Sequence, residues 1–270
     1  MKYQASLPEH NDNISHEHPL KDFVLILAGL SAVIFAAYLA LGWLVDVVVE
    51  RMNPETEARL TQLVAWTAPR GEAALQGREA WAQALADGLK TCAGVKAPVT
   101  VRVSRSASPN AMVAPGGLVI VHSALFDSVR SENGMAFVLA HELSHLAHRD
   151  HLRALGRRLV LVTAVTLLTG DGSGTAGVLL PAQHLGESRY SRGREAAADG
   201  KALDILQCRY EHAGGATEFF ETLQRKEDDV AAFTHYLASH PSMGARIDAL
   251  RGAIRQKEMK TGDVRPMPRF

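Results

Sequence analysis

This sequence of 270 residues has few cysteines and no net charge, and each of these two facts argues against a class of protein. Lys plus Arg and Asp plus Glu both total 29, so the formal net charge is zero, and no basic field favours nucleic acid as a partner. The two cysteines, Cys92 and Cys208, are too few for a disulfide framework and form no CxxC metal motif. We expect two unpaired buried thiols, because a disulfide between them requires an oxidising compartment.

Long apolar runs are also scarce, with one clear exception. The run from Phe23 to Val45 carries no charge, and a helix of that length crosses the roughly 30 Å hydrocarbon layer of a membrane. A buried core helix of this length would show a polar stripe, and a cleavable signal peptide would have a shorter apolar part. We therefore expect an N-terminal tail at 1–22 and a single-pass transmembrane anchor at 23–49, with the lipid bilayer as a partner.

The flanking charges say little about orientation. Lys21 precedes the apolar run, and Arg51 and Arg59 follow it. Positive charge favours the cytoplasmic side of a membrane, so this small excess slightly favours a cytoplasmic C-terminal part.

The rest of the chain alternates helical and strand-like patterns. Residues 53–90 are rich in Ala, Leu, Glu and Arg and predict helix, while the segments 98–106 and 116–126 predict strands. Ser131 is a plausible N-cap for a helix over 132–150. The apolar stretch 159–170 is too short to span a membrane; it forms a buried helix or a hairpin touching the membrane surface, and we expect the buried helix. We expect one domain over 53–255, followed by a loose tail at 256–270.

The segment "HELSHLAHRDH" contains the arrangement HExxH. On a helix, His141 and His145 lie four residues apart and share a face, so both imidazoles can bind one metal ion. Glu142 then lies close to a water on that ion and can take its proton. Two histidines on an amphipathic surface helix are the alternative, but the surrounding helix is otherwise apolar.

A catalytic zinc ion needs a third protein ligand. His148 and His151 are near candidates, but a helix that continues past His145 carries His151 too far along its axis, and His148 is badly placed for tetrahedral closure. The distant candidate is Glu195, with Asp199 four residues later on the same helical face, where it can accept the spare N–H of a ligating histidine. From these residues alone, Glu195 and Asp199 could equally well be two solvated carboxylates on the surface of an Ala-rich helix.

Four blocks in order, at 110–117, 138–151, 190–200 and 239–250, resemble peptidase family M48 of zinc endopeptidases, which includes Ste24-, Oma1-, HtpX- and BepA-like proteases. The resemblance covers roughly residues 98 to 255. It implies a mostly helical α+β fold, a gluzincin-type HExxH metalloprotease domain with a small β-sheet. It also implies one zinc ion per chain. The implied roles are His141, His145 and Glu195 as ligands, Glu142 as general base, Asp199 beside a ligand, and His240 at the oxyanion.

The implied function is a membrane-anchored zinc endopeptidase that hydrolyses protein or peptide substrates, unfolded or membrane-associated, at a bacterial inner membrane. The family resemblance slightly favours a periplasmic catalytic part. We expect an extended substrate to lie at Gly116 and Gly117, where missing side chains let another backbone approach, and at Asn110, whose amide can fix the register of the peptide. An ordinary turn before a core strand is the alternative. The alternative function is a membrane-tethered chaperone-like or binding protein with a structural or gated metal site.

Overall fold

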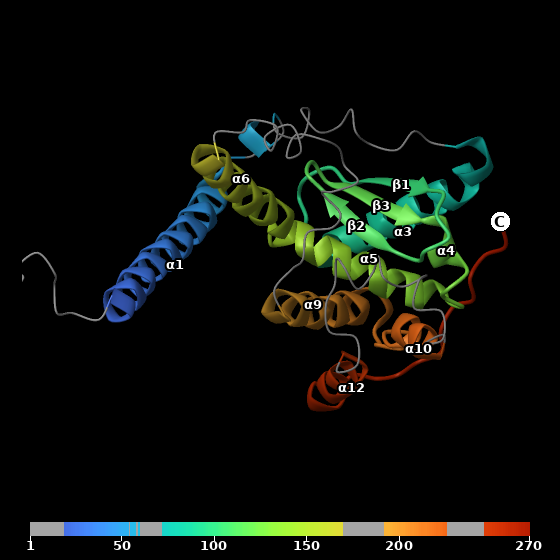
Figure 1. Ribbon diagram of the computed structural model, residues 1–270. Helices are drawn as coiled ribbons and strands as arrows, with labels where there is room; N and C mark the ends of the chain where they lie inside the picture. Colours follow the sequence, from blue (N-terminus) through green and yellow to red (C-terminus); the bar gives the residue numbers. More distant parts are fainter. Residues whose placement is uncertain (1–18, 54, 58, 60–71, 170–191, 226–245) are drawn as a thin grey trace, which may run out of the picture. The chain divides into compact units, whose positions relative to one another are not determined.

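The computed structural model describes residues 19–53, 55–57, 59, 72–169, 192–225 and 246–270 (Figure 1). The chain divides into two compact units, Met1–Leu44 and Val45–Phe270. Helix α1 (Pro19–Arg51) runs through this boundary, so its last turns belong to the second unit. The folded domain therefore begins about eight residues before the expected boundary at residue 53.

Helix α1 is long and apolar enough to cross a membrane over Leu20–Arg51. This agrees with the helix expected from the charge-free run. Its large apolar side chains, including Phe23, Phe35 and Trp43, are exposed. Such exposure is unfavourable in water, so the helix needs an apolar partner.

A small sheet forms one side of the second unit. It contains β1 (Thr100–Ser104), β2 (Ala111–Ala114) and β3 (Leu118–His122) in the order β1-β3-β2. Strands β1 and β3 are parallel, whereas β2 and β3 form an antiparallel hairpin. The first expected strand is confirmed. The second, expected over 116–126, is strand only over Leu118–His122, because a short helix follows it, and β2 lies between the two in the sequence.

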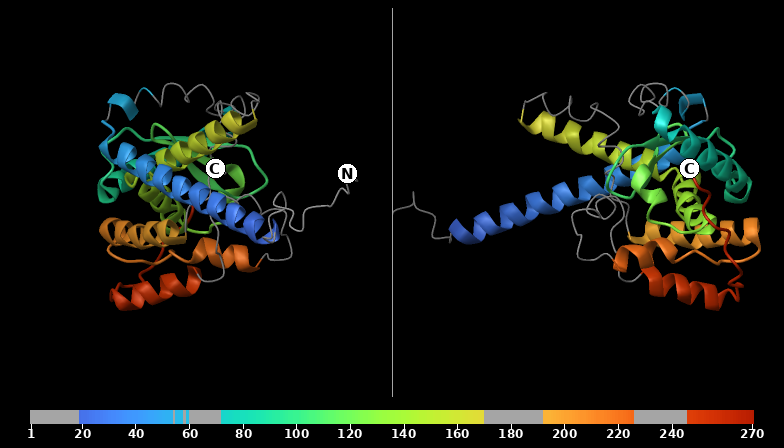
Figure 2. Two further views of the ribbon diagram at one scale, coloured as in Figure 1. Left: turned by 60° about the vertical axis from the view of Figure 1, so that its left-hand side comes forward. Right: turned by 90° about the vertical axis from the view of Figure 1, so that its right-hand side faces the viewer.

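Helices pack beneath this sheet in successive layers (Figures 1 and 2). Helix α3 (Gln76–Ala93), preceded by the short η1 (Ala73–Leu75), contacts β1, and α5 (Glu132–Ala147) contacts β2. Helix α9 (Arg192–Tyr210) packs against α3 and α5. Helix α10 (Glu218–Arg225) packs against α5, and α12 (Arg246–Gln256) contacts both α9 and α10. A short α4 (Ser123–Phe126) follows β3. The mostly helical fold with a small sheet is confirmed.

Helix α5 is the central element of the domain. As expected, Ser131 caps it, and its Oγ accepts a hydrogen bond from the Gly134 amide at 2.9 Å. Every residue from Asn133 to Leu146 is buried, so the helix is enclosed on all faces rather than along one stripe. It ends at Ala147, where Arg149 adopts a left-handed φ of 54° and a new helix begins.

That new helix, α6 (Asp150–Thr169), differs from the buried helix expected for residues 159–170. Leu159 is 42% exposed and Leu167 is 80% exposed. Arg153 and Arg157 in the first half of α6 form ion pairs with Asp46, whereas these two leucines of the second half are not covered by any residue that the structure describes. This exposed apolar second half of α6 is compatible with the alternative of a membrane contact.

The two cysteines form a disulfide, so the expectation of unpaired buried thiols is wrong. Cys92 on α3 is bonded to Cys208 on α9, with Cα atoms 5.9 Å apart. Cys208 is exposed, and Cys92 is half-buried. The pairing arises because α3 and α9 pack side by side, which brings together residues separated by 116 positions in the sequence.

The C-terminal residues also differ from the expected loose tail. Pro266 forms an isolated β-bridge with Ser131, and the Glu132 amide donates to the carbonyl of Arg265 at 2.8 Å. The final Phe270 ring packs edge-on against Trp81, with centroids 5.6 Å apart. The tail therefore pairs with the chain that enters α5 and adds an aromatic contact on α3.

Candidate metal centre

Helix α5 places two candidate ligands one turn apart. His141 and His145 share one face of the helix, and their Nε2 atoms are 3.1 Å apart. Both imidazoles are almost fully buried, as is the Glu142 side chain between them. Because α5 is enclosed by the sheet and the neighbouring helices, packing restricts these three polar side chains to few positions.

Helix α9 brings the third candidate ligand from a distant part of the chain. Glu195 lies in its first turn, with Oε2 3.4 Å from Nε2 of His141 and Oε1 3.3 Å from Nε2 of His145. Ligand atoms at about 2.0–2.1 Å from a tetrahedral zinc ion lie roughly 3.3–3.4 Å from one another. The three side chains, a possible metal-binding group, therefore have nearly the spacing that zinc requires.

A carboxylate holds the other nitrogen of each imidazole. The Nδ1–H of His141 donates to Oδ1 of Asp199, and the Nδ1–H of His145 donates to Oδ2 of Asp150, both at 2.9 Å. Each bond selects the tautomer whose Nε2 lone pair can bind a metal. Asp199 was expected here, but Asp150 was missed, because it reaches His145 only after the left-handed residue Arg149 redirects the chain.

Arg246 is a second residue that sequence reasoning missed. It begins α12 and is buried, and its Nε donates to Oδ2 of Asp199 at 2.9 Å. Its Nη1 lies 3.2 Å from Oε2 of Glu195, and its guanidinium lies over the Phe220 ring, 4.4 Å from the centroid. The planar cation thus offsets two buried carboxylates on α9. Its place in the 239–250 block is the signal that could have found it.

These acidic neighbours raise the affinity of both histidines for protons when no metal is bound. Burial by itself would lower the pKa of His141, but hydrogen bonds with Asp199 and Glu195 raise it to about 9. Burial likewise opposes protonation of His145, yet hydrogen bonds with Asp150 and Glu195 raise its pKa. A site that attracts protons so strongly also attracts a metal cation, whose binding releases those protons.

The two nearer histidines lie apart from this group. His148 is the C-cap residue of α5, and His151 is buried in the first turn of α6. Burial lowers the pKa of His151 to about 4, so its ring is neutral near pH 7. The clustering of His141, His145 and Glu195 therefore favours Glu195 over His151 as the third ligand.

The expected substrate residues have a different setting. Gly116 and Gly117 have left-handed φ values of 91° and 73° in the turn that joins β2 to β3. A Cβ atom at Gly117 would lie 2.1 Å from the carbonyl oxygen of Pro98. The backbone that approaches Gly117 is thus that of Pro98 in the same chain, which fits the alternative of an ordinary turn. Asn110 is buried, and its Oδ1 has no hydrogen-bond partner among the described residues.

One edge of β2 is open in the described part of the chain, because β2 pairs with β3 alone. The His122 amide donates to the Asn110 carbonyl at 2.9 Å, so alternate residues of β2 from Asn110 onward face β3. The N–H and C=O groups of Ala111 and Val113 therefore point to the open edge. His240, expected at the oxyanion, lies outside the described residues.

The chain is similar to known metalloproteases. The family profile for peptidase family M48 matches residues 76–254. The beta-barrel assembly-enhancing protease of Yersinia pestis is 30% identical over 159 residues, which cover 54% of this chain and 32% of that protein. The mitochondrial metalloendopeptidase OMA1 of Schizosaccharomyces pombe is 28% identical over 169 residues, covering 59% of this chain and 48% of OMA1. The metalloprotease YcaL of Escherichia coli is 30% identical over 164 residues, covering 58% and 63% respectively. The chain thus spans less than two thirds of each relative.

Proposed function

The chain belongs to peptidase family M48, and on that basis we propose that it is a membrane-anchored, zinc-dependent endopeptidase that cleaves proteins or peptides. The observation that carries the proposal is the buried group of His141, His145 and Glu195, whose ligand atoms all lie within 4.8 Å of one another. A second carboxylate, that of Glu142, lies on α5 between the two histidines. Two histidines, one carboxylate ligand and an adjacent carboxylate base make up the machinery of a zinc peptidase.

A bound zinc ion would make an attacking water more acidic and polarise the scissile carbonyl. Glu142 accepts a proton from the attacking water and passes it to the leaving amine. Its carboxylate is buried, so the surroundings restrict its orientation. Asp199 and Asp150 keep the two imidazoles in the tautomer and orientation that the ion requires. His240 would donate a hydrogen bond to the developing oxyanion.

The direct test is cleavage of an unfolded protein by the purified full chain in detergent with one equivalent of zinc. Glu142→Gln should keep its zinc and lose roughly 10²–10⁴-fold in rate, because an amide cannot accept the proton. Asp127→Asn removes an exposed carboxylate far from the proposed chemistry and should cleave normally. Full activity of Glu142→Gln would remove Glu142 from the mechanism. Zinc-loaded wild type that binds unfolded protein without cleaving it would favour the tethered binding protein.

We further propose that an extended substrate pairs with the open edge of β2, because main-chain pairing tolerates many sequences. Val113→Pro removes one N–H group from that edge while leaving the residues that face β3 unchanged, and proline is close to valine in volume. Loss of one hydrogen bond should lower kcat/KM for an extended peptide roughly 2- to 10-fold. Val113→Thr keeps the N–H and is the matched control. Equal kcat/KM values for both variants would place the substrate elsewhere.

The disulfide supports a catalytic unit on the oxidising side of the membrane, which is the periplasm for a bacterial inner-membrane protein. This choice goes against the small excess of positive charge after α1. The test quenches intact cells with acid and then alkylates free thiols. Cys92 and Cys208 should resist alkylation until a reductant is added. Free thiols before reduction would indicate a cytoplasmic domain.

The protein should also stay with membranes after carbonate washing, as an α1 that spans the bilayer requires.

A further inference from the structure

The junction between α5 and α6 is tied to the last turns of α1. Arg149, the left-handed residue at the junction, donates from Nη1 to the carbonyls of Val49 at 3.0 Å and Met52 at 2.9 Å. The last carbonyls of a helix lack intrahelical donors, and a cation there also suits the helix dipole. Arg149 therefore fastens the end of α1 at a point four residues beyond the candidate ligand His145.

The carboxylate of Asp46 on α1 forms ion pairs with three arginines from two other helices. Nη2 of Arg157 lies 2.8 Å from one carboxylate oxygen, and Nε of Arg153 lies 3.2 Å from the other. Nη2 of Arg194 on α9 approaches at 3.5 Å. The Asp46 side chain is only 35% exposed. Without this charge, three guanidinium groups would repel one another at close range.

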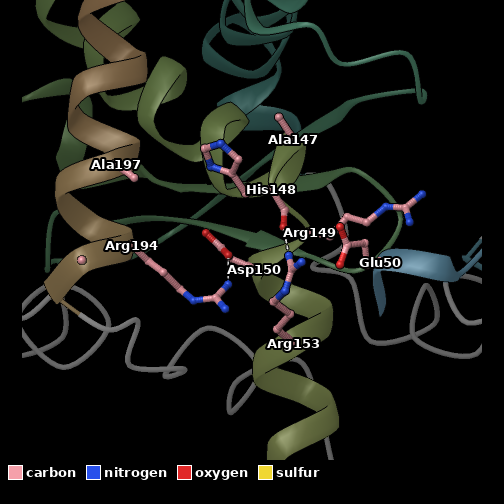
Figure 3. A pocket seen from close by; sticks show the side chains of 9 residues that line it. Glu50, Ala147, His148, Arg149, Asp150, Arg153, Arg194 and Ala197 are labelled. Atoms are coloured by element: carbon pink, nitrogen blue, oxygen red, sulfur yellow. Dashed lines mark hydrogen bonds and ion pairs between the residues drawn. The ribbon is translucent and has the colours of Figure 1, made fainter. Parts of the chain in front are cut away.

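Arg194 continues this chain of contacts to the metal centre. Its Nη1 pairs with Oδ1 of Asp150, and Oδ2 of the same carboxylate accepts the hydrogen bond from Nδ1 of His145. Figure 3 shows the direct contact between Arg194 and Asp150. Both residues line a cavity of about 430 Å³, which Arg153 and Glu50 also line. A continuous series of charged contacts thus joins Asp46 to a candidate metal ligand.

We propose that Asp46 is a positioning residue that acts on His145 through Arg194 and Asp150, so the end of α1 is a working part of the metal centre. By neutralising Arg153 and Arg157, Asp46 lets Arg194 remain beside Asp150, and Asp150 then holds the His145 ring. Outer carboxylates of this kind tune metal affinity. The inference rests on the proposed metal centre but not on peptidase activity.

The test measures zinc affinity of the full chain in detergent by competition with a chelator, well below the melting temperature. Asp46→Asn should weaken zinc binding about 3- to 10-fold, less than the roughly 10- to 100-fold expected for Asp150→Asn. Asp46→Glu should restore most of the affinity. Glu50→Gln is the matched control, because this acid lies one turn further along α1 beside the same cavity, and its zinc affinity should equal that of wild type.

Two further measurements distinguish positioning from simple attachment of α1. The absorption bands of bound Co²⁺ should shift in Asp46→Asn, because the geometry around His145 changes. In an Asp150→Asn background, Asp46→Asn should cause no further loss of zinc, since the effect passes through Asp150. A lower melting temperature with unchanged zinc affinity and Co²⁺ spectrum would make Asp46 merely structural and overturn the proposal, as would additive losses. Wild type that binds no zinc would overturn the metal centre itself, whereas zinc binding without proteolysis would overturn only the peptidase.

Discussion

The bond between Cys92 and Cys208 fastens α9, which carries Glu195 and Asp199, to α3 in the core. Replacing both cysteines with serine removes this link, and serine suits a position as exposed as that of Cys208. We expect the double variant to fold, because α9 also packs against α5 and buries Leu203 and Leu206. It should, however, unfold much more readily than the oxidised wild type.

The magnitude follows from the length of the closed loop. The two cysteines are separated by 116 positions, and a cross-link over a loop of about 100 residues lowers the free energy of the folded state relative to the unfolded chain by up to about 4.7 kcal/mol. Real disulfides often contribute less, so a loss of about 3–5 kcal/mol is expected. For a domain of this size, that corresponds to a fall in Tm of roughly 6–20 °C.

The assay is urea unfolding of the full chain in detergent, followed by far-UV circular dichroism, with and without a phosphine reductant that binds zinc weakly. Wild type should lose its extra stability on reduction and then match the double variant, which should not respond to the reductant. The measurement is repeated with excess zinc and with a chelator, because ligand binding stabilises the folded state separately. Wild type with the same midpoint in both redox conditions would refute the reasoning, since it would mean that the cross-link leaves the unfolded chain unrestricted.

Three further expectations concern other parts of the domain. Glu195→Ala should lose bound zinc while His151→Leu keeps about one equivalent by metal analysis; the reverse result would make His151 the third ligand. The folded pKa of His151, about 4, is below its unfolded value near 6.5, so stability is full above pH 6.5 and falls as the pH drops towards 4. His151→Leu should therefore remove about 2 kcal/mol of the decrease in unfolding free energy between pH 7 and pH 5, and an unchanged pH slope would contradict this. Phe270→Ala should lower the unfolding free energy by about 1 kcal/mol through the lost Trp81 contact. An unchanged urea midpoint would mean that the C-terminal tail is loose, as the sequence predicted.

Features that depend on neighbouring residues could be predicted from the sequence alone. A charge-free run long enough to span a membrane predicts α1, because helix rise per residue sets the length. Ser131 predicts the start of α5, since a side-chain oxygen can satisfy an amide that the helix leaves unpaired. The four-residue spacing of His141 and His145 already places both rings on one face, whatever surrounds the helix.

Features that join distant segments required the tertiary structure. The sequence pattern around Glu195 fits a metal ligand and a solvated carboxylate equally well. Only the packing of α9 against α5 brings this carboxylate to the histidines. Asp150 depends on a single left-handed residue, and Arg246 depends on where α12 lies. The disulfide and the attached tail were missed for the same reason. Local periodicity reports which face of an element is buried, but not which other element covers that face, and these contacts are made between elements.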